Sequence, residues 1–354
     1  MDHLKWIEID LGAVRHNVGV VLERLAPGVR LMAVVKADGY GHGAVQVAKA
    51  AVQAGASHLG TLTLEEALEL RAAGIRSPIV LLAPPLPEQA AAAARARLDA
   101  TVDSERLAAS LAKGASRSRP LKVHLDVDFG LGRWGAPPRR ASALAARIRA
   151  DRRLRLAGFS THLDYVPGKN AVEAEQKLRR FERLASKARR LTPGLVRHAA
   201  NSSILLDFPA RQFDLVRVGN LLYGINPTDT AAPLKSPWSF KARIIALRRI
   251  ARGQAVGYAS EYVAPRSMTV ATLPVGYADG LTMEPVERLI GFGSRFSYWG
   301  MIDGKQAPFV GRCAISHVML DVTAARSARV GDVINLPIRR TAASARIPRV
   351  YFGG

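Results

Sequence analysis

Short apolar segments alternate with segments of helical periodicity through the first two thirds of this 354-residue chain, and this alternation restricts the possible folds more than any other feature. Eight segments have the apolar, β-branched character of buried strands: Leu31–Val35, His58–Leu62, Ile79–Ala83, Ala100–Val102, Leu121–Val127, Leu156–His162, Val196–Ala199 and Leu215–Val218. Helical spacing occupies Gly12–Leu25, Ala44–Ala54, Leu64–Ala73, Pro87–Ala96, Glu105–Ala112, Arg140–Ala150, Ala171–Leu191 and a short stretch after Asn201. Eight strands in alternation with helices predict a parallel (βα)8 barrel of the TIM type.

The sequence changes in character after Pro227, where helical spacing gives way to strands joined by Gly- and Pro-rich connections. The expected strands are Trp238–Ile250, Met268–Val275, Ala307–Val310, His317–Val322 and Asp332–Leu336. This pattern predicts a second, mostly antiparallel β domain. We therefore expect a barrel over residues 1–235 and a β domain over residues 236–354. The opening strand, about residues 4–11, alternates in polarity and is free to pair with the C-terminal domain.

Composition narrows the classes of function. The formal net charge is +22, but the arginines are dispersed over helical stretches among Ala and Leu, which is typical of solvated helix faces. We therefore expect no nucleic-acid partner, although a basic surface attracts small anions. No apolar run approaches the roughly 18 residues of a membrane span, and the N-terminus lacks the pattern of a secretory signal. The single cysteine, Cys313, excludes an intrachain disulfide, so we expect a cytoplasmic protein without a membrane partner.

Lys36 is the first candidate for chemistry, because it follows the apolar run Leu31–Val35 and precedes a segment with three glycines, Tyr40 and His42. In a βα barrel the active site lies at the carboxyl ends of the strands. Burial disfavours the ammonium form of a lysine, and a neutral amine reacts with carbonyl groups. The alternative is a strand-end lysine that extends to solvent.

Two loops late in the predicted barrel suit an anion. Asn201 and Ser202 precede a short helix, and Arg217, Gly219 and Asn220 follow a strand. Hydroxyl groups, backbone N–H groups and a helix N-terminus together favour phosphate. The alternative is a helix cap and an ordinary turn.

Arg133 has Asp126 and Asp128 nearby in the sequence, and an arginine oriented by a carboxylate binds a substrate carboxylate or phenolate. The alternative is a surface ion pair. His162 and His198, taken singly, are more typical of core histidines than of ligands. No His or Cys spacing characteristic of a metal site is present, and we predict none.

Taken together, these segments resemble the alanine racemases, enzymes with fold-type III binding of pyridoxal 5′-phosphate. The resemblance covers nearly the whole length and includes a segment close to the family's cofactor-lysine signature. The matching segments are Ile7–Leu11 with Asn17, Ala33–Gly43, His124–Gly135, Thr161-His162, His198–Ser202, Val216–Gly219, Leu222–Gly224, Lys235–Pro237, Tyr258, Gly276–Gly280 and Val310–Arg312.

The resemblance implies two catalytic bases. Lys36 would carry the cofactor as a Schiff base and act as one base, and Tyr258, from the second subunit of a head-to-tail homodimer, would act as the opposite base. Arg133, Ile315 and Tyr277 would contact the substrate or line its entrance.

The resemblance also implies a cofactor-binding set, in which His162 would link Arg217 towards Tyr258 and Arg217 would face the pyridine nitrogen. The set consists of Lys36, Tyr40, His162, Asn201, Ser202, Arg217, Gly219 and Asn220.

The sequence departs from the family at three positions that bear on the site. Asp126 stands where the family commonly has a lysine, often carbamylated, and we expect its carboxylate to orient Arg133 directly. Ser316 replaces an aspartate that helps to position the substrate carboxylate. Ala345 replaces a tyrosine that contacts phosphate and guards the pocket, so we expect weaker cofactor retention or acceptance of larger side chains.

The resemblance therefore predicts racemisation of a small amino acid, most simply of L-alanine to D-alanine for a bacterial cell wall. A racemase of broader specificity is the alternative that Ala345 and Ser316 favour. A pyridoxal-phosphate-binding homeostasis protein without catalysis is the third, and Tyr258 and the β domain argue against it.

Overall fold

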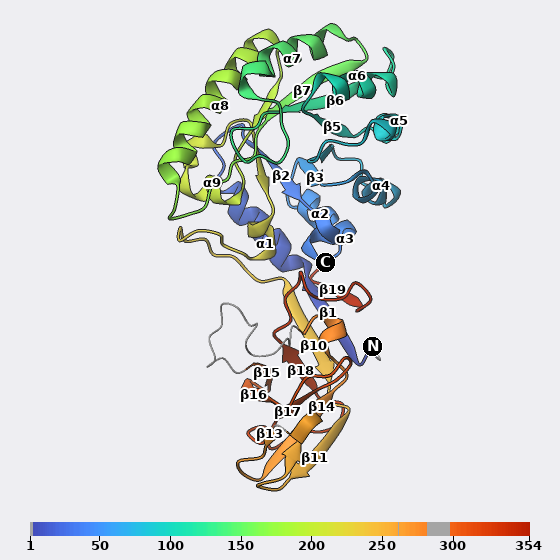
Figure 1. The fold of residues 1–354 in the computed structure, drawn as a ribbon, viewed down its shortest axis with the longest axis vertical. Helices are drawn as coiled ribbons and strands as arrows, with labels where there is room; N and C mark the ends of the chain where they lie inside the picture. Colours follow the sequence, from blue (N-terminus) through green and yellow to red (C-terminus); the bar gives the residue numbers. More distant parts are fainter. Residues whose placement is uncertain (1–2, 261, 282–297) are drawn as a thin grey trace. The chain divides into compact units, whose positions relative to one another are not determined.

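A computed structural model describes residues 3–260, 262–281 and 298–354, and the chain divides into two compact units (Figure 1). Residues 11–237, with 353–354, form what we call the barrel unit. Residues 1–10 and 238–352 form the β unit.

The barrel unit contains the eight parallel strands that the sequence predicts. They are β2 (Arg30–Val34), β3 (His58–Thr61), β4 (Ile79–Leu81), β5 (Asp99–Val102), β6 (Leu121–Asp126), β7 (Leu154–Ser160), β8 (Val196–His198) and β9 (Leu215–Val218). They pair in the order β8-β7-β6-β5-β4-β3-β2-β9. Backbone hydrogen bonds from Asp214 N to Arg197 O (3.0 Å) and from Arg217 N to Ala200 O (2.9 Å) join the two end strands and close the barrel.

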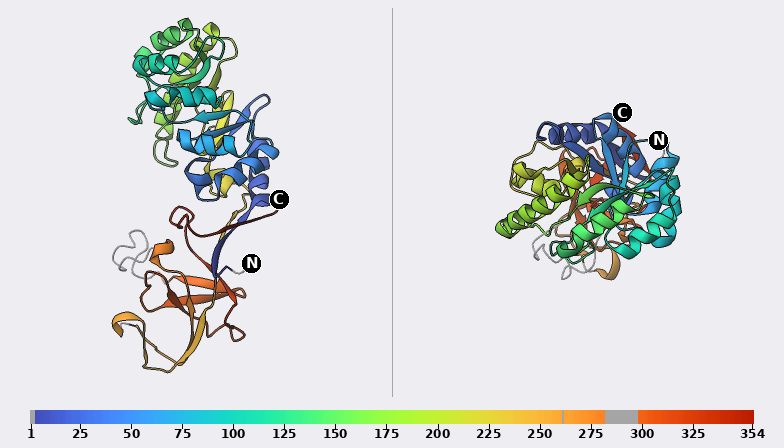
Figure 2. Two further views of the ribbon diagram at one scale, coloured as in Figure 1. Left: turned by 90° about the vertical axis from the view of Figure 1, so that its right-hand side faces the viewer. Right: turned by 90° about the horizontal axis from the view of Figure 1, so that it is seen from above.

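Helices surround these strands, as Figure 2 shows for the barrel unit seen from above. They are α1 (Leu11–Leu22), α3 (Ala44–Gln53), α4 (Leu64–Ala72), α5 (Ala90–Arg95), α6 (Glu105–Lys113), α7 (Pro138–Ala150), α8 (Ala171–Leu191) and α9 (Ser202–Asp207). Short 3₁₀ turns cover Pro87–Gln89, Pro209–Arg211 and Asn220–Tyr223. None of the helices in the described part of the chain has the length and apolar character needed to cross a bilayer.

A chain of polar groups lies inside the barrel. His124 Nδ1 lies 2.8 Å from His198 Nε2, and His124 Nε2 lies 3.4 Å from Asp99 Oδ2. All three side chains are buried. The neighbouring strand leaves room for them, because a Cβ atom on Gly158 would lie 2.3 Å from His124 Nδ1. A side chain larger than glycine is therefore excluded at this position of β7.

The main sheet of the β unit is mostly antiparallel, as expected. Within the described residues its strands are β1 (Lys5–Asp10), β10 (Trp238–Arg243), β11 (Ala246–Ile250), β14 (Met268–Leu273), β15 (Trp299–Ile302), β16 (Lys305–Val310), β17 (Val318–Asp321), β18 (Val333–Leu336) and β19 (Arg349–Phe352). A small separate pair consists of β12 (Ala255–Val256) and β13 (Tyr262–Val263). The opening strand β1 pairs antiparallel with β10 and parallel with β19.

The prediction of one strand in the β unit, Trp238–Ile250, is wrong. Trp238–Ile250 is interrupted between β10 and β11, where Ile244 N donates to Asp332 O and Ile245 N donates to Thr272 O, each at 2.9 Å. The chain leaves β18 and joins β14 at this point, so two strands replace one. The apolar pattern continues across the break because Ile244 and Ile245 are both apolar, although only Ile244 is buried, and periodicity alone therefore hides the break.

Candidate active site

A cavity of about 240 Å³ opens at the carboxyl ends of the barrel strands, and its size suits a small ligand. It is lined by Val34, Lys36, Tyr40, Leu62, Leu82, Asp126, Arg133, Trp134, His162, Asn201, Ser202, Ser203, Arg217, Gly219 and Asn220. Residues singled out in five separate stretches of the barrel sequence therefore come together around one cavity.

Lys36 begins an unusual turn directly after β2. In the segment α2 (Lys36–Tyr40), the φ angles of Ala37, Asp38, Gly39 and Tyr40 are +52°, +51°, +59° and +56°. Left-handed backbone costs roughly 1–2 kcal/mol for each residue that is not glycine. The chain therefore reverses through a left-handed turn that sets Lys36 and Tyr40 at its two ends, and the cost must be offset by contacts elsewhere.

Carboxylates supply part of that compensation. Glu66 accepts hydrogen bonds from Ala37 N at 2.6 Å and from Leu62 N at 2.7 Å, and so joins the turn to the end of β3. Asp38 Oδ1 accepts from Ala44 N at 2.9 Å, at the start of α3. Bonds to charged acceptors are among the stronger ones in proteins, and here they hold the turn to two helices.

Aromatic rings pack against the same turn. The ring of Tyr223 stacks on Tyr40, with centroids 4.6 Å apart, and lies 4.8 Å from His42. Its hydroxyl donates to Val34 O at 3.0 Å. Gly219 completes the arrangement, because a Cβ atom there would lie 2.4 Å from the hydroxyl oxygen of Tyr40. The Tyr40 hydroxyl is thereby held against the backbone of the loop that follows β9.

The amine of Lys36 is poised to be neutral. Burial lowers its pKa below the ordinary lysine value, and the charges of Arg133 and Arg217 lower it further. The carboxylate of Glu66 opposes this shift but does not reverse it. A larger fraction of the amine is therefore unprotonated near neutral pH than in an exposed lysine, which favours both nucleophilic and basic behaviour.

Arg217 is fixed beneath the cavity. It is buried, and its Nη2 atom donates to Thr161 O and to Ala199 O, the latter at 3.1 Å. Burial and the charge of Arg133, opposed by Asp126, together lower its pKa to about 10, so the guanidinium stays charged at neutral pH. Burial and the nearby Arg217 and Arg133 lower the pKa of His162 to about 3, so its imidazole is neutral.

Arg133 lies on a loop whose shape depends on Asp128. The Asp128 carboxylate accepts from Gly130 N at 2.9 Å and from Leu131 N at 2.8 Å. The guanidinium of Arg133 stacks over the Trp134 ring, 3.7 Å from its centroid. In the described structure no ion pair joins Arg133 to Asp126 or Asp128. The second aspartate therefore shapes the loop backbone rather than pairing with the arginine.

Asp126 faces the cavity and is buried, and the hydroxyl of Ser160 donates to its Oδ1 at 2.6 Å. Burial raises the pKa of Asp126, although Ser160, Arg217 and Arg133 each oppose the shift. The carboxylate thus supplies negative potential to both arginines at a distance and loses it at a higher pH than an exposed aspartate would.

The residues at the start of α9 both cap the helix and line the cavity. Asn201 Oδ1 accepts from Ile204 N at 3.0 Å and caps α9, so the capping alternative is correct for this side chain. Ser202 and Ser203 occupy the first turn, line the cavity and present a hydroxyl-rich helix start. With the Gly219–Asn220 backbone opposite, this end of the cavity suits an anion.

The remaining candidates form a group within the β unit. Tyr277 N donates to Ala314 O and Ala278 N donates to Ile315 O, each at 3.1 Å. The Tyr258 ring lies 6.1 Å from His317, two residues beyond Ile315. Tyr258, Tyr277 and Ile315 are 60%, 53% and 57% exposed, and the neighbouring Ser316 is also exposed.

Three residues that shape the site were not among the site residues predicted from the sequence: Glu66, Tyr223 and Ser160. Of these, Tyr223 lay in the matching segment Leu222–Gly224, but no role was assigned to it. Glu66 had a detectable signal, because Thr63 and Glu66 form a capping box at the start of α4. That motif indicates a helix start, but it does not indicate that the same carboxylate reaches the turn after β2. Contacts between separate strand ends set the roles of all three.

The chain matches two family models over most of its length. Residues 9–227 match the alanine racemase N-terminal domain, and residues 238–348 match the alanine racemase C-terminal domain. Alanine racemase from Desulfovibrio desulfuricans is 34% identical, with 99% of this chain and 98% of that protein covered. Alanine racemase from Sorangium cellulosum is 38% identical, with 92% and 86% covered. The crystal structure of alanine racemase from E. faecalis has a TM-score of 0.88 and 29% identity, with 99% and 98% covered.

The lowered pKa of Lys36 leads to a labelling prediction. In protein treated with hydroxylamine to release carbonyl compounds, Lys36 should react with acetic anhydride at lower pH than the exposed Lys169. The variant Arg133→Gln removes a nearby cation, so the pKa of Lys36 should rise and its labelling at a fixed pH should fall. Peptide mass spectrometry across a pH series measures both.

Arg139→Gln is the control for this experiment, because Arg139 is exposed on α7 and does not line the cavity. Its labelling curve for Lys36 should overlay that of the unaltered protein. Identical curves for Lys36 and Lys169 would contradict the prediction.

Proposed function

Because the chain belongs to the alanine racemase family, we propose that it interconverts L- and D-alanine with pyridoxal 5′-phosphate as cofactor. The convergence of Lys36, Arg217 and the anion-suited loops on one cavity is the observation that carries the proposal. The physiological direction would be formation of D-alanine, in the cytoplasm, for a bacterial cell wall.

The residues around the cavity fit this cofactor. Its phosphate matches the end of the cavity where Ser202, the Gly219 backbone and the Tyr40 hydroxyl meet. Its aldehyde matches an amine, Lys36, whose pKa is lowered. The cations that face the cavity outnumber its one buried carboxylate, which favours a dianionic ligand. When bound, pyridoxal 5′-phosphate delocalises the charge left on an amino acid's α-carbon after its proton is removed.

Arg217 would determine which reactions the site favours. It would face the ring nitrogen, as the family resemblance implies, with its guanidinium held by the Thr161 and Ala199 carbonyls. A guanidinium that stays charged is a poor proton donor, so the ring nitrogen would remain unprotonated. The charge on the α-carbon would then be less stabilised and shorter lived, which limits side reactions other than the return of the proton.

Inversion of the α-carbon requires proton carriers on opposite faces of the substrate. We assign these roles to the Nζ atom of Lys36 and the Oη atom of Tyr258. The exposure of Tyr258, Tyr277 and Ile315 as one group supports a role for this surface in completing a site on a second copy of the chain. The proposed assembly is therefore a head-to-tail homodimer. In it Tyr277 would line the entrance, and the backbone of Ile315 would meet the substrate carboxylate.

A racemase of broader specificity is the second candidate, favoured by Ala345 and Ser316. Arg349 Nη1 donates to the backbone oxygens of Ala345 (2.9 Å) and Ser344 (3.2 Å), so this loop is held in place without a tyrosine side chain. The match of residues 238–348 to the family's C-terminal domain argues against a homeostasis protein that consists of a barrel alone.

The two-base proposal predicts distinct defects in two variants. Lys36→Ala should abolish racemisation in both directions. Tyr258→Phe should lower the rate by roughly 10²–10⁴-fold, the usual contribution of a general base. In deuterium oxide it should still exchange the α-hydrogen of the one enantiomer whose proton Lys36 accepts. Chiral chromatography and NMR measure the two activities.

Tyr262→Phe is the matched control for the second variant, since Tyr262 lies on β13 close to Tyr258 in sequence, and it should retain full activity. Normal rates for Tyr258→Phe in both directions would refute the assignment of its phenol.

The raised pKa of Asp126 predicts a pH-dependent KM. Protonation of Asp126 removes the negative potential at Arg133, so KM for alanine should rise as pH falls through the raised pKa of Asp126. Asp126→Asn should raise KM by about tenfold, equivalent to about 1.4 kcal/mol, and should remove this pH dependence. Asp126→Glu should restore part of it. Steady-state kinetics between about pH 5 and pH 9 test this, and an Asp126→Asn variant with unchanged KM and pH profile would exclude the role.

The loss of the tyrosine at position 345 predicts a wider pocket. L-2-Aminobutyrate and L-serine should be racemised with kcat/KM within about 200-fold of the alanine value, because one methylene changes binding by about 1–3 kcal/mol. Ala345→Tyr should reduce activity on 2-aminobutyrate more than on alanine, whereas Ala345→Ser should leave the ratio of the two activities unchanged. Strict alanine preference in the unaltered protein would count against the wider pocket.

A further inference from the structure

A second hollow, of about 540 Å³, lies at the opposite end of the barrel, where the strands begin. Five cations line it: Arg30 at the start of β2, Lys122 in β6, Arg149 in the last turn of α7, Arg152 just after that helix, and Arg155 in β7. All five side chains are exposed. Arg149, Arg152 and Arg155 belong to one basic stretch, residues 149–155. Arg30 and Lys122 come from distant parts of the sequence, so the fold brings two further strands to this stretch.

These five cations have no ion-pair partner among the residues that the structure describes. Two arginines nearby do form ion pairs. Arg153, in an adjacent hollow that shares Arg152, pairs with Asp151 at 2.7 Å, and Arg147 pairs with Glu105 at 3.5 Å. Five cations without ion-pair partners therefore line this one hollow, which we call the strand-start hollow, and their mutual repulsion is relieved when an anion binds there.

The floor of the hollow has one carboxylate, and it is already engaged. Asp99 is buried beside His124, with Oδ2 3.4 Å from Nε2. Burial alone would raise the pKa of Asp99, but the hydrogen bond from His124 and the nearby charge of Lys122 lower it overall, so the group stays ionised. The five cations and this one carboxylate leave a formal charge of +4 around the hollow.

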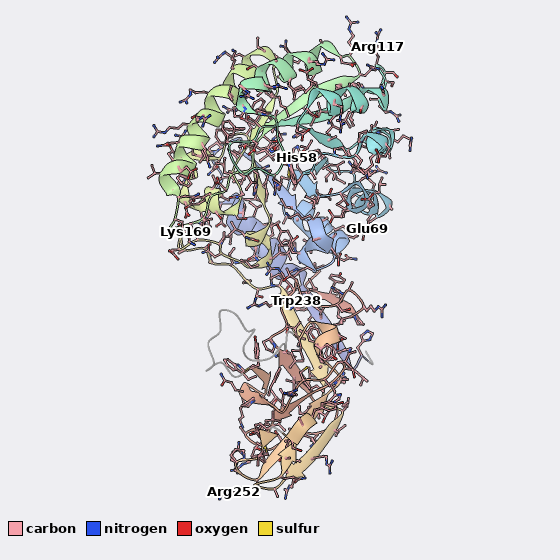
Figure 3. The ribbon with its side chains drawn as sticks, in the orientation of Figure 1. His58, Glu69, Arg117, Lys169, Trp238 and Arg252 are labelled. Carbon is pink, nitrogen blue, oxygen red and sulfur yellow. The ribbon has the colours of Figure 1, made fainter. Side chains whose placement is uncertain are left out.

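The pKa of His58 reflects the electrostatic potential in this hollow. It lies at the start of β3 among the lining residues and is labelled in Figure 3. Burial and the charges of Arg30, His124 and Lys122, opposed by Asp99, together lower its pKa to about 4. A positive field at the hollow thus opposes the protonation of a neighbouring imidazole.

The favourable interaction of cations with a helix C-terminus accounts for Arg149 by itself. It does not account for Arg30, Lys122 or Arg155, which stand on strands. A concave, cationic hollow concentrates the field at its opening, and arginine forks match the oxygens of phosphate groups. We propose that this hollow binds a compact multivalent anion with a chain of phosphate groups, either inorganic or part of a nucleotide. The proposal does not rest on the racemase assignment, because it uses none of the residues of that site.

The test measures binding of inorganic tripolyphosphate by calorimetry to cofactor-saturated protein, without divalent metal, at low and at moderate salt. The triple variant Arg149→Gln, Arg152→Gln, Arg155→Gln should weaken binding by at least about tenfold, because it removes three of the five cations. The control is Arg248→Gln, Arg249→Gln, Arg252→Gln on the exposed β11 region of the β unit, where Arg252 is labelled in Figure 3. It removes the same net charge and should bind within twofold of the unaltered protein.

A second measurement needs no variant. The pKa of the His58 imidazole, followed by NMR, should rise when tripolyphosphate is added, because the bound anion offsets the surrounding cations. Tighter binding of adenosine triphosphate than of tripolyphosphate would support the proposal with a nucleotide as the natural source, and the reverse would support an inorganic chain.

Three results would overturn the proposal: no binding at low salt, equal weakening by the two triple variants, or an unchanged pKa of His58. Tighter binding of a single-stranded RNA homopolymer than of either phosphate compound would also overturn it, in favour of a macromolecular partner.

Discussion

The left-handed turn after β2 is the constraint on which the candidate active site depends. It carries three residues other than glycine at positive φ, and each costs roughly 1–2 kcal/mol relative to ordinary backbone. Glu66 and Asp38 offset this cost through bonds to backbone N–H groups, and Tyr223 packs against the far side. A turn of this shape ends a strand within one residue, so the amine of Lys36 and the phenol of Tyr40 are both delivered to one cavity. An ordinary right-handed helix start would carry the chain away from the strand ends.

Charge within the cavity then gives different protonation behaviour to Lys36 and Arg217, which are both cations in neutral water. Three cationic side chains share a small, partly dry volume with one buried carboxylate, and Coulomb interactions in such a place are several times stronger than in bulk solvent. Lys36 loses its proton at the lowest pH of the three cations, because the ordinary pKa of a lysine lies closer to neutrality than that of an arginine. Arg217 stays charged even with its pKa lowered to about 10. Burial and the neighbouring cations lower the pKa of His162 to about 3, so its imidazole stays neutral. One field therefore produces a basic amine and a permanent cation a few side chains apart.

The sequence predicted the parts of the fold that depend on local pattern. All eight barrel strands and the helices between them follow from apolar periodicity, because a parallel strand is buried on both faces and is bounded by turn residues. The β unit was harder. β15 and β19 are short, and their polar and glycine residues obscure the period of two, so only their partners in the sheet define them. The interruption between β10 and β11 was hidden because the two residues at the break, Ile244 and Ile245, are both apolar.

The same distinction applies to the site. Lys36, Arg217 and the glycine-rich loops were detectable because unusual residues stand where strands end. Asp128 was grouped with Asp126 by proximity in sequence, yet Asp128 shapes a loop and Asp126 faces the cavity, and only the path of the backbone separates these roles.

The net charge of +22 does not by itself show where positive charge gathers in the folded protein. Glu175 and Glu182 on α8 pair with Arg179 and Arg211, and these ordinary ion pairs account for part of the positive charge. The cations of the strand-start hollow come from three separate parts of the sequence, residue 30, residue 122 and residues 149–155, and these parts meet only when the strands close into a barrel, so composition alone assigns the cations to helix surfaces. A closed barrel has two ends, and in this chain both concentrate positive charge. At the carboxyl ends of the strands, Arg133 and Arg217 lie near the buried carboxylate of Asp126. At the strand-start hollow, no carboxylate among the described residues forms an ion pair with any of the five cations. Repulsion that is left uncompensated lowers stability unless a ligand relieves it, and that is the physical reason to seek an anion at the second end.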